Sequence, residues 1–559
     1  MENTYLCPRC LVNDPHEGRL NSIKDIAFSM PAEFYRQLHE SIIQVEANIE
    51  RIGDTTELLS KRLSGEDRFK CITLDDIESC MSFRKKRETM YDGIWTLDIV
   101  WLKEKLTWLG IEDYDLSGVE NVTLLDVRCS FYYTRSTDGT LIPKEIRDGS
   151  ENIVSDERRC GKCGRLLSPD IGKAQEIRIL LQGNSRAGKS SCIVSAVDWM
   201  LSMRKAGIEV RLCERDLRQD DSHYHNWIHE ELENYRAGYK VKKTPIAQKE
   251  PGMFSVLVKV NDELRVLTFI DMPGEFFESP SDGQDGLFLQ YRPIYRCCDI
   301  VWTCMQYEVL AQKPLTGQQI SRMEDQTSLT EKQLEKALGY YIARLRVIMS
   351  YLKDNGIHSF PYHAVILTKS DAVSDYQDRL EERRVFSADP KNLKDALTKY
   401  RRSEGDAGVL ALDEFKFHHF ANDVRRFFVE SQKENDDNMC QIMEEFSQNT
   451  RYFAMSSYGH YVVEKDAPPS ETKRPCPPTP YHTQLPLLWA MTAFDQLPVC
   501  YDVNLKEELS ALGRMITGER YRDTGKTKKD CTVFSRAGKK TVDNLLKNNS
   551  IYQEHERII

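Results

Sequence analysis

The sequence predicts an α/β protein built around a doubly wound, mostly parallel β-sheet. Short apolar segments alternate with segments of helical periodicity in the middle of the chain, which is the pattern of such a sheet. A glycine-rich loop separates one of these strands from the helix that follows it. Two Cys-x-x-Cys pairs, Cys7/Cys10 and Cys160/Cys163, further predict a separate metal-binding module before the sheet.

The composition bounds the class of protein. A chain of 559 residues exceeds one compact core, so roughly two to four domains are expected. The 77 basic and 87 acidic residues give a net charge of −10, which argues against a surface built to grip nucleic acid. The first residues lack a signal-peptide pattern and no apolar run is long enough to span a bilayer. We therefore expect a cytoplasmic protein without a membrane span.

The first region, residues 1–170, is predicted to be a zinc-ribbon-like module with a helical insertion. Cys7, Cys10, Cys160 and Cys163 form two pairs that each resemble the knuckle of a zinc ribbon. Between the pairs, "PAEFYRQLHESIIQVEANIERI" has helical spacing, whereas "NVTLLDVRCSFYYTR" is typical of a strand. The four cysteines would complete a structural Zn²⁺ site that leaves no open position for catalysis.

Other interpretations of these cysteines stay open. The pairs lie about 150 residues apart, which is more than ordinary ribbon spacing. Each pair could instead be a set of unliganded thiols. The remaining candidate ligands are isolated in the sequence: Cys71, Cys80 and Cys129.

The second region, residues 174–371, supplies the alternating elements of the sheet. "EIRILLQG" predicts a strand that ends at the glycine-rich loop, and "SSCIVSAVDWMLSMRKAG" predicts the helix after it. "FSVLVKV" and "RVLTFIDMPGE" predict two strands joined by a turn. "DIVWTCM" and "YHAVILTKSD" predict two more strands, with "EKQLEKALGYYIARLRVIMSYLKDNG" as a long helix between them.

Three further regions follow. Residues 372–483 predict a helical insertion that ends in the proline-rich loop "APPSETKRPCPPTP". Residues 484–520 predict the end of the sheet unit, with "LPLLWAMTAFD" as a strand and a helix near "LKEELSALGRMI". Residues 521–559 predict a basic, polar C-terminal tail.

The glycine-rich loop has the spacing GxxxxGK[ST] of a phosphate-binding loop. Its glycines stand where the backbone must pass close to an anion, directly before a helix start. Lys189 would reach the β- and γ-phosphates, and the Ser190 hydroxyl would hold Mg²⁺. The predicted nucleotide contacts are Gly183, Asn184, Ser185, Arg186, Ala187, Gly188, Lys189, Ser190 and Ser191.

Two further motifs follow apolar strands. Asp271 and Gly274 form DxxG, in which the carboxylate can hold Mg²⁺ and the glycine amide can meet a γ-phosphate. Thr368, Lys369 and Asp371 belong to "TKSD", where a carboxylate can select guanine over adenine. In isolation "TKSD" also fits an ordinary turn after a strand.

The order of these three motifs resembles the P-loop GTPases of the Ras-like, translation-factor-related (TRAFAC) class. The resemblance implies a P-loop NTPase fold with GTP as substrate and Mg²⁺ as cofactor. It implies that Thr244 is the switch threonine at Mg²⁺ and γ-phosphate, and that Thr492 and Ala493 belong to the last base-contacting loop. Glu275 occupies the position where many members carry a glutamine that orients water, so the implied catalytic set is Lys189, Thr244, Gly274 and Glu275.

These features together predict a GTP-binding and GTP-hydrolysing switch or assembly factor. Its expected partners are GTP, GDP and a protein partner or a second copy of the chain. The layout also resembles the multidomain, double-GTPase-like proteins of prokaryotic conflict systems, which would imply a role in defence. The alternatives are a scaffold that binds nucleotide without hydrolysis, an ATPase or kinase that uses the same loop, and a zinc-ribbon nucleic-acid binder, which the acidic balance disfavours.

Overall fold

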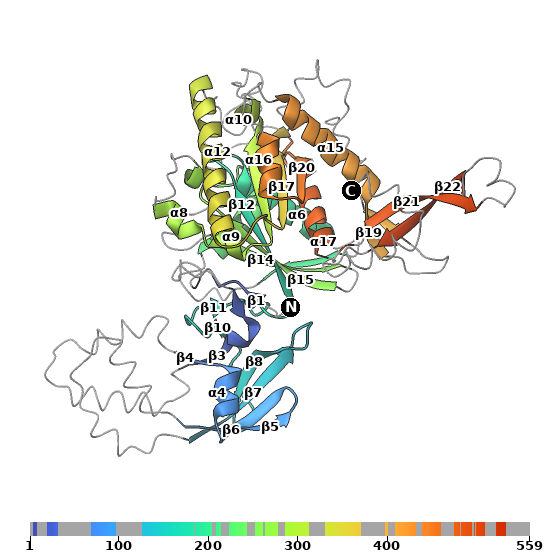
Figure 1. The fold of residues 1–559 in the computed structure, drawn as a ribbon. Coiled ribbons are helices and arrows are strands. Elements are labelled where there is room, and N and C mark those ends of the chain that lie inside the picture. The colour runs from blue at the N-terminus through green and yellow to red at the C-terminus, as the bar shows by residue number, and fades with distance from the viewer. Residues whose placement is uncertain are drawn as a thin grey trace. The chain divides into compact units, whose positions relative to one another are not determined.

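The chain divides into two compact units in the computed structural model (Figure 1). The first, here the cysteine unit, comprises residues 1–176 and 213–222, and the second, the sheet unit, comprises residues 177–212 and 223–559. Among the described residues, no helix combines the length and apolarity needed to cross a bilayer. The structure describes residues 4–7, 10, 20–31, 69–96, 126–184, 186–203, 208–213, 223–242, 252–260, 263–277, 286–311, 330–370, 397–400, 409–431, 439–459, 475–480, 482–494, 497, 499–508 and 521–532.

The described part of the cysteine unit consists mainly of antiparallel strands. β1 (Thr4–Tyr5) pairs with β2 (Asn21–Ser22). A four-stranded sheet has the order β11 (Leu166–Leu167), β10 (Arg158–Cys160), β3 (Ile26–Pro31) and β4 (Phe69–Ile72). A five-stranded meander runs through β5 (Arg84–Arg87), β6 (Met90–Thr96), β7 (Asp126–Arg135), β8 (Leu141–Asp148) and β9 (Ile153–Ser155). The short helices are η1 (Ile23–Asp25) and α4 (Leu74–Ser79).

Aromatic packing forms the core of this unit. The alternation of side chains along β7 places Phe131 and Tyr133 on one face of the strand. Both rings lie 5.1 Å from the ring of Phe28 on β3, so the two larger sheets share one core. The predicted strand at "NVTLLDVRCSFYYTR" is confirmed for the residues of β7. The helix predicted from "PAEFYRQLHESIIQVEANIERI" lies outside the described residues.

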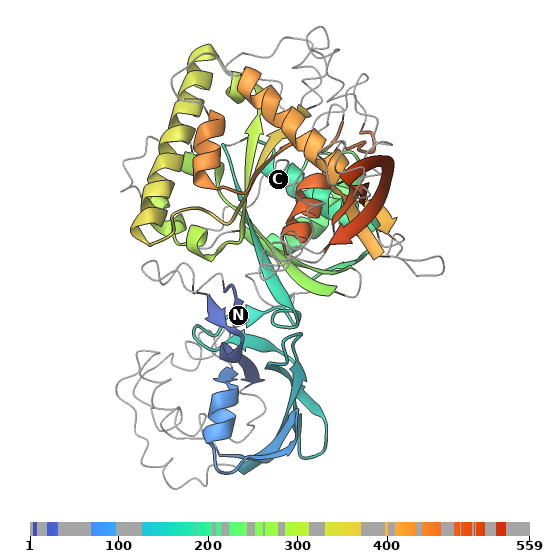
Figure 2. The same ribbon diagram turned by 45° about the vertical axis from the view of Figure 1, so that its right-hand side comes forward.

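A seven-stranded, mixed sheet organises the sheet unit (Figure 2). Its strand order is β13 (Ile208–Leu212), β14 (Gly252–Val260), β15 (Glu263–Asp271), β12 (Gln175–Gln182), β16 (Ile300–Gln306), β17 (Tyr362–Thr368) and β20 (Thr450–Ala454). Neighbouring strands among β12, β16, β17 and β20 are parallel, whereas β14 is antiparallel to both β13 and β15. The predicted hairpin and the predicted strands of residues 174–371 are confirmed.

The strand order places a switch point beside β12. After β12 the chain builds β13 to β15 on one side of it and then returns to place β16 on the other side. In open α/β sheets, ligands bind in the crevice at the carboxyl ends of the strands next to such a point. The fold therefore marks the end of β12, where the glycine-rich loop begins, as the expected ligand position.

Helices cover both faces of the sheet. Ile177, Ile179 and Leu181 alternate along β12 and pack in one core cluster with α6 (Lys189–Ser202), α7 (His223–Arg236) and α17 (Leu485–Ala493). The opposite face carries Gln182, which contacts α12 (Glu331–Asp354). The other helices are η5 (Gly274–Phe277), α8 (Gly286–Tyr291), α9 (Ile294–Cys297), α10 (Tyr307–Ala311), α15 (Glu414–Ser431) and α16 (Met439–Phe446).

The helices predicted after the glycine-rich loop and before β17 are confirmed as α6 and α12. α12 begins with a capping box, in which Thr330 and Gln333 exchange side-chain and backbone hydrogen bonds. The cap fixes the start of this helix and thereby the side chains that it presents to the sheet.

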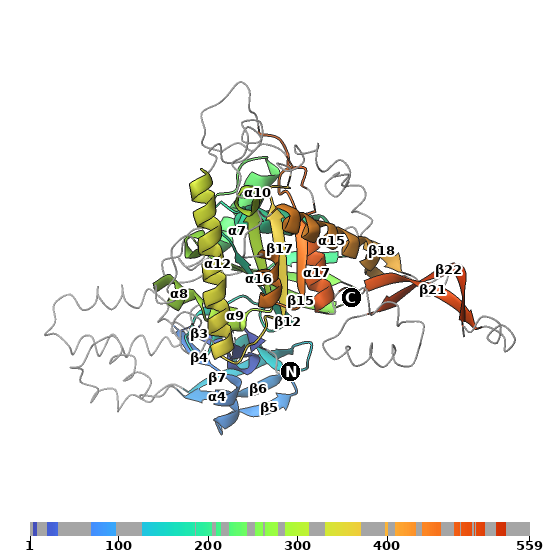
Figure 3. The ribbon, with the colours of Figure 1, turned by 45° about the horizontal axis from the view of Figure 1, so that its top comes forward.

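Residues 372–483 and the C-terminal part depart from the prediction. β20 comes from the predicted helical insertion, yet it completes the central sheet beside β17. A second sheet has the order β18 (Leu397–Tyr400), β19 (Val409–Asp413), β21 (Val499–Glu508) and β22 (Tyr521–Thr532) (Figure 3). The prediction of a helix near "LKEELSALGRMI" was wrong for its residues up to Glu508, because these belong to the strand β21. The predicted polar tail begins with the strand β22.

The strand predicted at "LPLLWAMTAFD" was also wrong, because residues Leu485–Ala493 form the helix α17. All but the last of its residues are buried, so the segment is apolar on every side and shows no helical stripe. Periodicity cannot separate a buried strand from a buried helix in such a run. Pro486 in the first turn was the available signal, since proline is favoured there.

Candidate nucleotide-binding site and metal centre

The glycine-rich loop has a backbone that side chains would disrupt. Gly183 has a φ of +143°, and a Cβ placed on it would lie 2.2 Å from the carbonyl oxygen of Cys304. Gly188 has a φ of +77° and is the N-cap of α6. Both glycines are therefore needed where the chain turns from β12 into α6. The first amides of α6 consequently lie beside the end of β12, in the arrangement that binds phosphate.

Lys189 lies within this loop rather than in solvent. Its ammonium group donates hydrogen bonds to the carbonyl oxygens of Gly183, at 2.8 Å, and Asn184, at 3.0 Å. The side chain is buried. The loop thus holds a cation beside the backbone amides that a phosphate would meet.

Ser190 and Asp271 bring two metal-ligand types together. The Ser190 hydroxyl lies 3.4 Å from a carboxylate oxygen of Asp271, the last residue of β15. The backbone holds this pair in place, because the amide of Met272 donates to the carbonyl of Leu181 at 3.1 Å. Neighbouring ligands of an octahedral Mg²⁺ lie about 2.9 Å apart. The oxygens of Ser190 and Asp271 are therefore close to the spacing of a shared Mg²⁺.

The turn after Asp271 is anchored to α12. Arg344, on α12, is fully buried and donates a hydrogen bond from Nε to the carbonyl oxygen of Phe276 at 2.8 Å. Its guanidinium carbon lies 4.6 Å from the centre of the Phe276 ring. The ring of Phe277 stacks on Tyr341 at 4.8 Å. Gly274 is buried at the start of this turn, whereas Glu275 is exposed.

A network of buried polar side chains connects the start of the glycine-rich loop to neighbouring elements of the sheet unit. Gln182, directly before Gly183, donates to the Thr303 hydroxyl at 2.7 Å and accepts from Tyr295 at 2.5 Å. The Thr303 hydroxyl lies 2.8 Å from Nε2 of His363. Burial lowers the pKa of His363 to about 4, so the ring is neutral at ordinary pH. The network can therefore be satisfied without a buried charge.

Thr368 ties the predicted base-selecting motif to the phosphate loop. Its hydroxyl donates to the carbonyl of Ala187 at 2.7 Å, with the carbonyl of Met305 at 3.2 Å. Lys369, the next residue, has a φ of +55°, which is the left-handed region. "TKSD" therefore begins at the same edge of the sheet as the glycine-rich loop. Three predicted site residues, Ser185, Thr244 and Asp371, lie outside the described residues.

The loop after β20 also lies at this edge, and the sequence analysis missed it. The amide of Met455 donates to the carbonyl of Leu367 at 2.8 Å, and the amide of Ser370 donates to the carbonyl of Met455 at 3.1 Å. Met455 therefore lies beside residues 368–370, the described part of "TKSD", and Ser456 and Ser457 follow it in the chain. The strand-like run "TRYFA" followed by small polar residues was the available signal, but it stood in a region interpreted as helical.

This placement bears on the two residues predicted for the last base-contacting loop. Thr492 and Ala493 end the helix α17 and follow no strand of the sheet. The Thr492 hydroxyl donates to the carbonyl of Trp489 within the same helix, at 2.7 Å. The expectation that a strand leads into them was wrong, and the strand that follows β17 in the sheet is β20.

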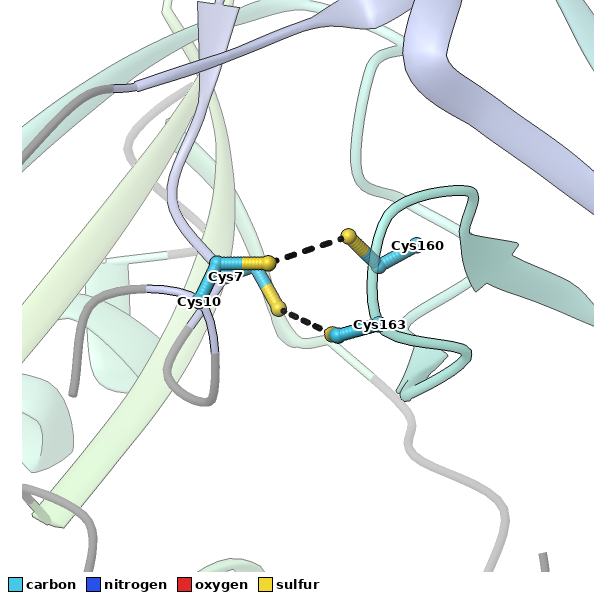
Figure 4. Close-up of side chains that lie close together, drawn as sticks. All are labelled: Cys7, Cys10, Cys160 and Cys163. Atoms are coloured by element: carbon cyan, nitrogen blue, oxygen red, sulfur yellow. Dashed lines mark hydrogen bonds between the residues drawn. The ribbon is translucent and has the colours of Figure 1, made fainter. Parts of the chain in front are cut away.

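The four predicted cysteines converge in the cysteine unit (Figure 4). The sulfur atoms of Cys7 and Cys163 lie 3.4 Å apart, and those of Cys10 and Cys160 lie 3.5 Å apart. All four sulfur atoms fall within 4.8 Å of one another. A tetrahedral Zn²⁺ with bonds of about 2.3 Å places its sulfur ligands about 3.8 Å apart. The four cysteines therefore fit one zinc ion shared by both pairs.

The surroundings of the cysteines suit a closed metal site. The side-chain amide of Asn21 donates to the sulfur of Cys160 at 3.7 Å, as an outer-shell group does to a metal-bound thiolate. Hydrogen bonding among the four thiols lowers the pKa of Cys160, with Cys10 as the main cause, and raises the pKa values of Cys7 and Cys10. Cys71, Cys80 and Cys129, the alternative ligands, are not part of the cluster.

Comparison with known proteins gives distant structural likeness alone. No family model and no curated protein matches the sequence. The structure is similar to the G domain of the T. maritima FeoB iron transporter, at 11% identity and a TM-score of 0.16, over 37% of this chain and 84% of that one. It is also similar to the septin GTPase domain from Chlamydomonas reinhardtii, at 12% identity and a TM-score of 0.19, over 51% of this chain and 76% of that one.

Proposed function

We propose that the sheet unit binds and hydrolyses GTP in a Mg²⁺-dependent manner and acts as a nucleotide-controlled switch. One observation carries the proposal: at the switch point of the sheet, the glycine-rich loop holds Lys189 and brings Ser190 to within 3.4 Å of Asp271. A triphosphate bound there would meet backbone amides, an ammonium group and a metal ion together. Such a site neutralises the charge that hydrolysis develops.

Each remaining group has a role in this proposal. Ser190 and Asp271 would hold Mg²⁺, which supplies charge neutralisation between the β- and γ-phosphates. The buried Gly274 amide would sense the γ-phosphate, and its turn would transmit the change to α12 through Phe276 and Arg344. Asp371 would select guanine, supported by the tie between Thr368 and Ala187.

Calorimetry with GTP, GDP and ATP in Mg²⁺ tests the proposal on the intact chain and on Asp371→Asn. We expect both guanine nucleotides to bind more tightly than ATP, and the substitution to weaken them at least about tenfold, because it removes a charged acceptor of the base. Asp354→Asn is the matched control, since Asp354 is an exposed residue at the end of α12. Equal affinities for ATP and GTP, unchanged by Asp371→Asn, would contradict the proposed selectivity for guanine nucleotides.

A second candidate function is a scaffold that binds GTP without turning it over. The observation that favours it is Glu275, which is exposed and stands where a water-orienting glutamine is expected from the resemblance. Phosphate release measured on the same protein separates the two. Hydrolysis that Glu275→Ala abolishes supports the switch, whereas tight GTP binding without phosphate release supports the scaffold.

For the cysteine unit we propose a structural Zn²⁺ held by Cys7, Cys10, Cys160 and Cys163. Four thiolates fill the coordination sphere of zinc and leave no position for substrate. The proposed role is therefore to hold strand β10 and the N-terminal segment together, and no chemistry is assigned to it.

A further inference from the structure

Three segments from distant parts of the sequence converge on the loop Met455–Gly459, here called the base-side loop. Two of its contacts come from α6 and α7, the two helices that follow the phosphate loop in sequence. The hydroxyl of Tyr235, on α7, donates to the carbonyl of Ser457 at 2.5 Å. The hydroxyl of Ser195, on α6, donates to the carbonyl of Cys192 at 3.0 Å and lies 3.3 Å from the hydroxyl of Ser457, from which it can accept.

Tyr458 is the centre of this arrangement. Its hydroxyl donates to the carbonyl of Tyr239 at 3.0 Å and accepts from the amide of Val241 at 2.9 Å. Its ring lies 5.1 Å from the ring of Tyr235, and the side chain is 5% exposed. One buried hydroxyl thus satisfies two backbone groups of the segment that follows α7.

The proline-rich segment also contacts the base-side loop and the residues that follow α7. The amide of Thr479 donates to the carbonyl of Tyr458 at 2.8 Å. A Cβ on Gly459 would lie 2.2 Å from the carbonyl oxygen of Thr479, and a Cβ on Gly238 would lie 2.1 Å from that of Cys476. Both glycines have a positive φ, so neither position accepts a side chain. The backbones here approach as closely as glycine allows.

We propose that Tyr458 is a positioning residue that fixes the base-side loop and thereby sets the release rate and base specificity of the bound nucleotide. This inference rests on the proposed guanine-nucleotide site. The base-side loop is joined to "TKSD" through Met455 and Ser370, so a loop that shifts would move the base-reading edge. Discrimination between bases requires groups held in place within a fraction of an ångström. α7 and the proline-rich segment, which lie outside the predicted motifs, supply that rigidity.

The arrangement also explains why α7 is present. α7 lies between the phosphate loop and β14 in sequence, and the base-side loop is contacted by Tyr235 of α7 and by the segment Tyr239–Val241 that follows the helix. The helix therefore connects the chain that leaves the phosphate loop to the loop beside the predicted base. Loss of this connection should affect contacts with the base and leave contacts with the phosphates unchanged.

Tyr458→Phe tests the proposal in the full-length protein, because it removes the hydroxyl and keeps the ring against Tyr235. Tyr452→Phe is the matched control: Tyr452 lies on β20, is equally buried, and its hydroxyl bonds to Cys440 and Glu444 of α16 instead. The measurements are the dissociation rate of fluorescent GDP, the ratio of GTP to ATP affinity, and the affinity for Mg²⁺–tripolyphosphate, a probe without a base.

For Tyr458→Phe we expect GDP to dissociate about tenfold faster, because two hydrogen bonds are lost, and we expect the preference for GTP over ATP to fall. Binding of Mg²⁺–tripolyphosphate should stay unchanged, and Tyr452→Phe should resemble the unsubstituted protein. Ser195→Ala removes a single tether, so a smaller change in the same direction is expected; it tests the proposal independently where Tyr458→Phe fails to fold.

Two outcomes would overturn the inference alone. Equal effects of Tyr458→Phe and Tyr452→Phe would assign both residues to general stability, and a matching loss of tripolyphosphate binding would assign Tyr458 to the phosphate side. Failure of the unsubstituted protein to prefer guanine nucleotides is a different result. It would remove the proposed function first and this inference with it.

Discussion

The cysteine cluster and the phosphate loop are assembled in opposite ways. The cysteines come from positions separated by 150 residues and more, and they meet over a small core of apolar residues. The residues of the phosphate loop are consecutive, and the loop rests on an extended apolar core of the sheet unit. One site is defined by distant residues that a metal would join, and the other by a short local turn on a prebuilt scaffold.

The difference indicates where the folding free energy of each unit comes from. The cluster around the cysteines includes Tyr5, Ile23, Ile26, Ile142, Leu167 and Ile171. Each fully buried side chain of this size contributes about 1.5–3 kcal/mol, and conformational entropy opposes most of that gain. A structural zinc contributes roughly 10–16 kcal/mol in small zinc domains. The region of the cysteine unit around this cluster should therefore depend on its metal, whereas the sheet unit should depend on its core.

The largest predicted effect follows from removal of the metal. Chelation, or the variant Cys160→Ser, should unfold the region of β3, β10 and β11, because it removes the metal that would join the two cysteine pairs. Guanine-nucleotide binding by the sheet unit should persist. Hydrogen exchange measured by mass spectrometry, together with the zinc content of the protein, checks both halves of the expectation.

Cys80→Ser is the control for the chelation experiment, because Cys80 lies outside the cluster and its sulfur contacts Ser82. This variant should retain its zinc and its protection from exchange. Full protection of β10 in metal-free protein would contradict this expectation and would mean that the apolar cluster holds the region together without metal.

The second-largest predicted effect comes from a substitution that displaces the backbone of the phosphate loop and leaves its functional side chains unchanged. Gly183→Ala places a Cβ 2.2 Å from the carbonyl oxygen of Cys304, so the loop must move. We expect nucleotide affinity to fall by about a hundredfold or more, since the amides and Lys189 lose their common orientation. Calorimetric titration with GDP measures the loss.

Gly356→Ala provides the matched control for this substitution. Gly356 also has a positive φ, of +76°, but its Cβ position has no neighbour within 4 Å. Both variants place a side chain at a positive φ, +143° at Gly183 and +76° at Gly356, but only Gly183→Ala collides with a neighbouring carbonyl oxygen. Equal nucleotide affinities in both would show that the tight approach at Gly183 does not shape the site.

The same comparison explains how much the sequence could predict. The phosphate loop, Asp271 and Thr368 each follow an apolar strand, and the parallel sheet brings the ends of its strands to one edge, so local patterns were enough to group them. The cysteine cluster was predictable from its residue type and the repeated Cys-x-x-Cys spacing. The path that brings the pairs together was not, because strand pairing over long separations leaves no local signal.

The errors have a common physical cause. α17 is buried on all sides, and β20 is a short strand inside a region rich in helical pattern, so neither has a periodicity that identifies it. Both are decided by tertiary packing against the sheet. The consequence for the site was specific: the strand expected before Thr492 and Ala493 is the helix α17, and the strand beside β17 is β20, which ends at Ala454.

The smallest predicted effect comes from the loss of one side-chain hydrogen bond in a region whose strand pairing stays intact. Thr368 and Ala187 are 181 residues apart, as distant in sequence as the cysteines, but they are joined by one hydrogen bond in a region already held by strand pairing. Thr368→Val should therefore weaken GDP binding only about tenfold, the cost of one buried hydrogen bond and its unsatisfied acceptor. Thr492→Val is the control, because it removes a buried hydroxyl that bonds within its own helix. Calorimetry should find GDP affinity unchanged in the Thr492 variant; a larger loss there than in Thr368→Val would return the base-contacting role to α17 and contradict its assignment to the loop after β20.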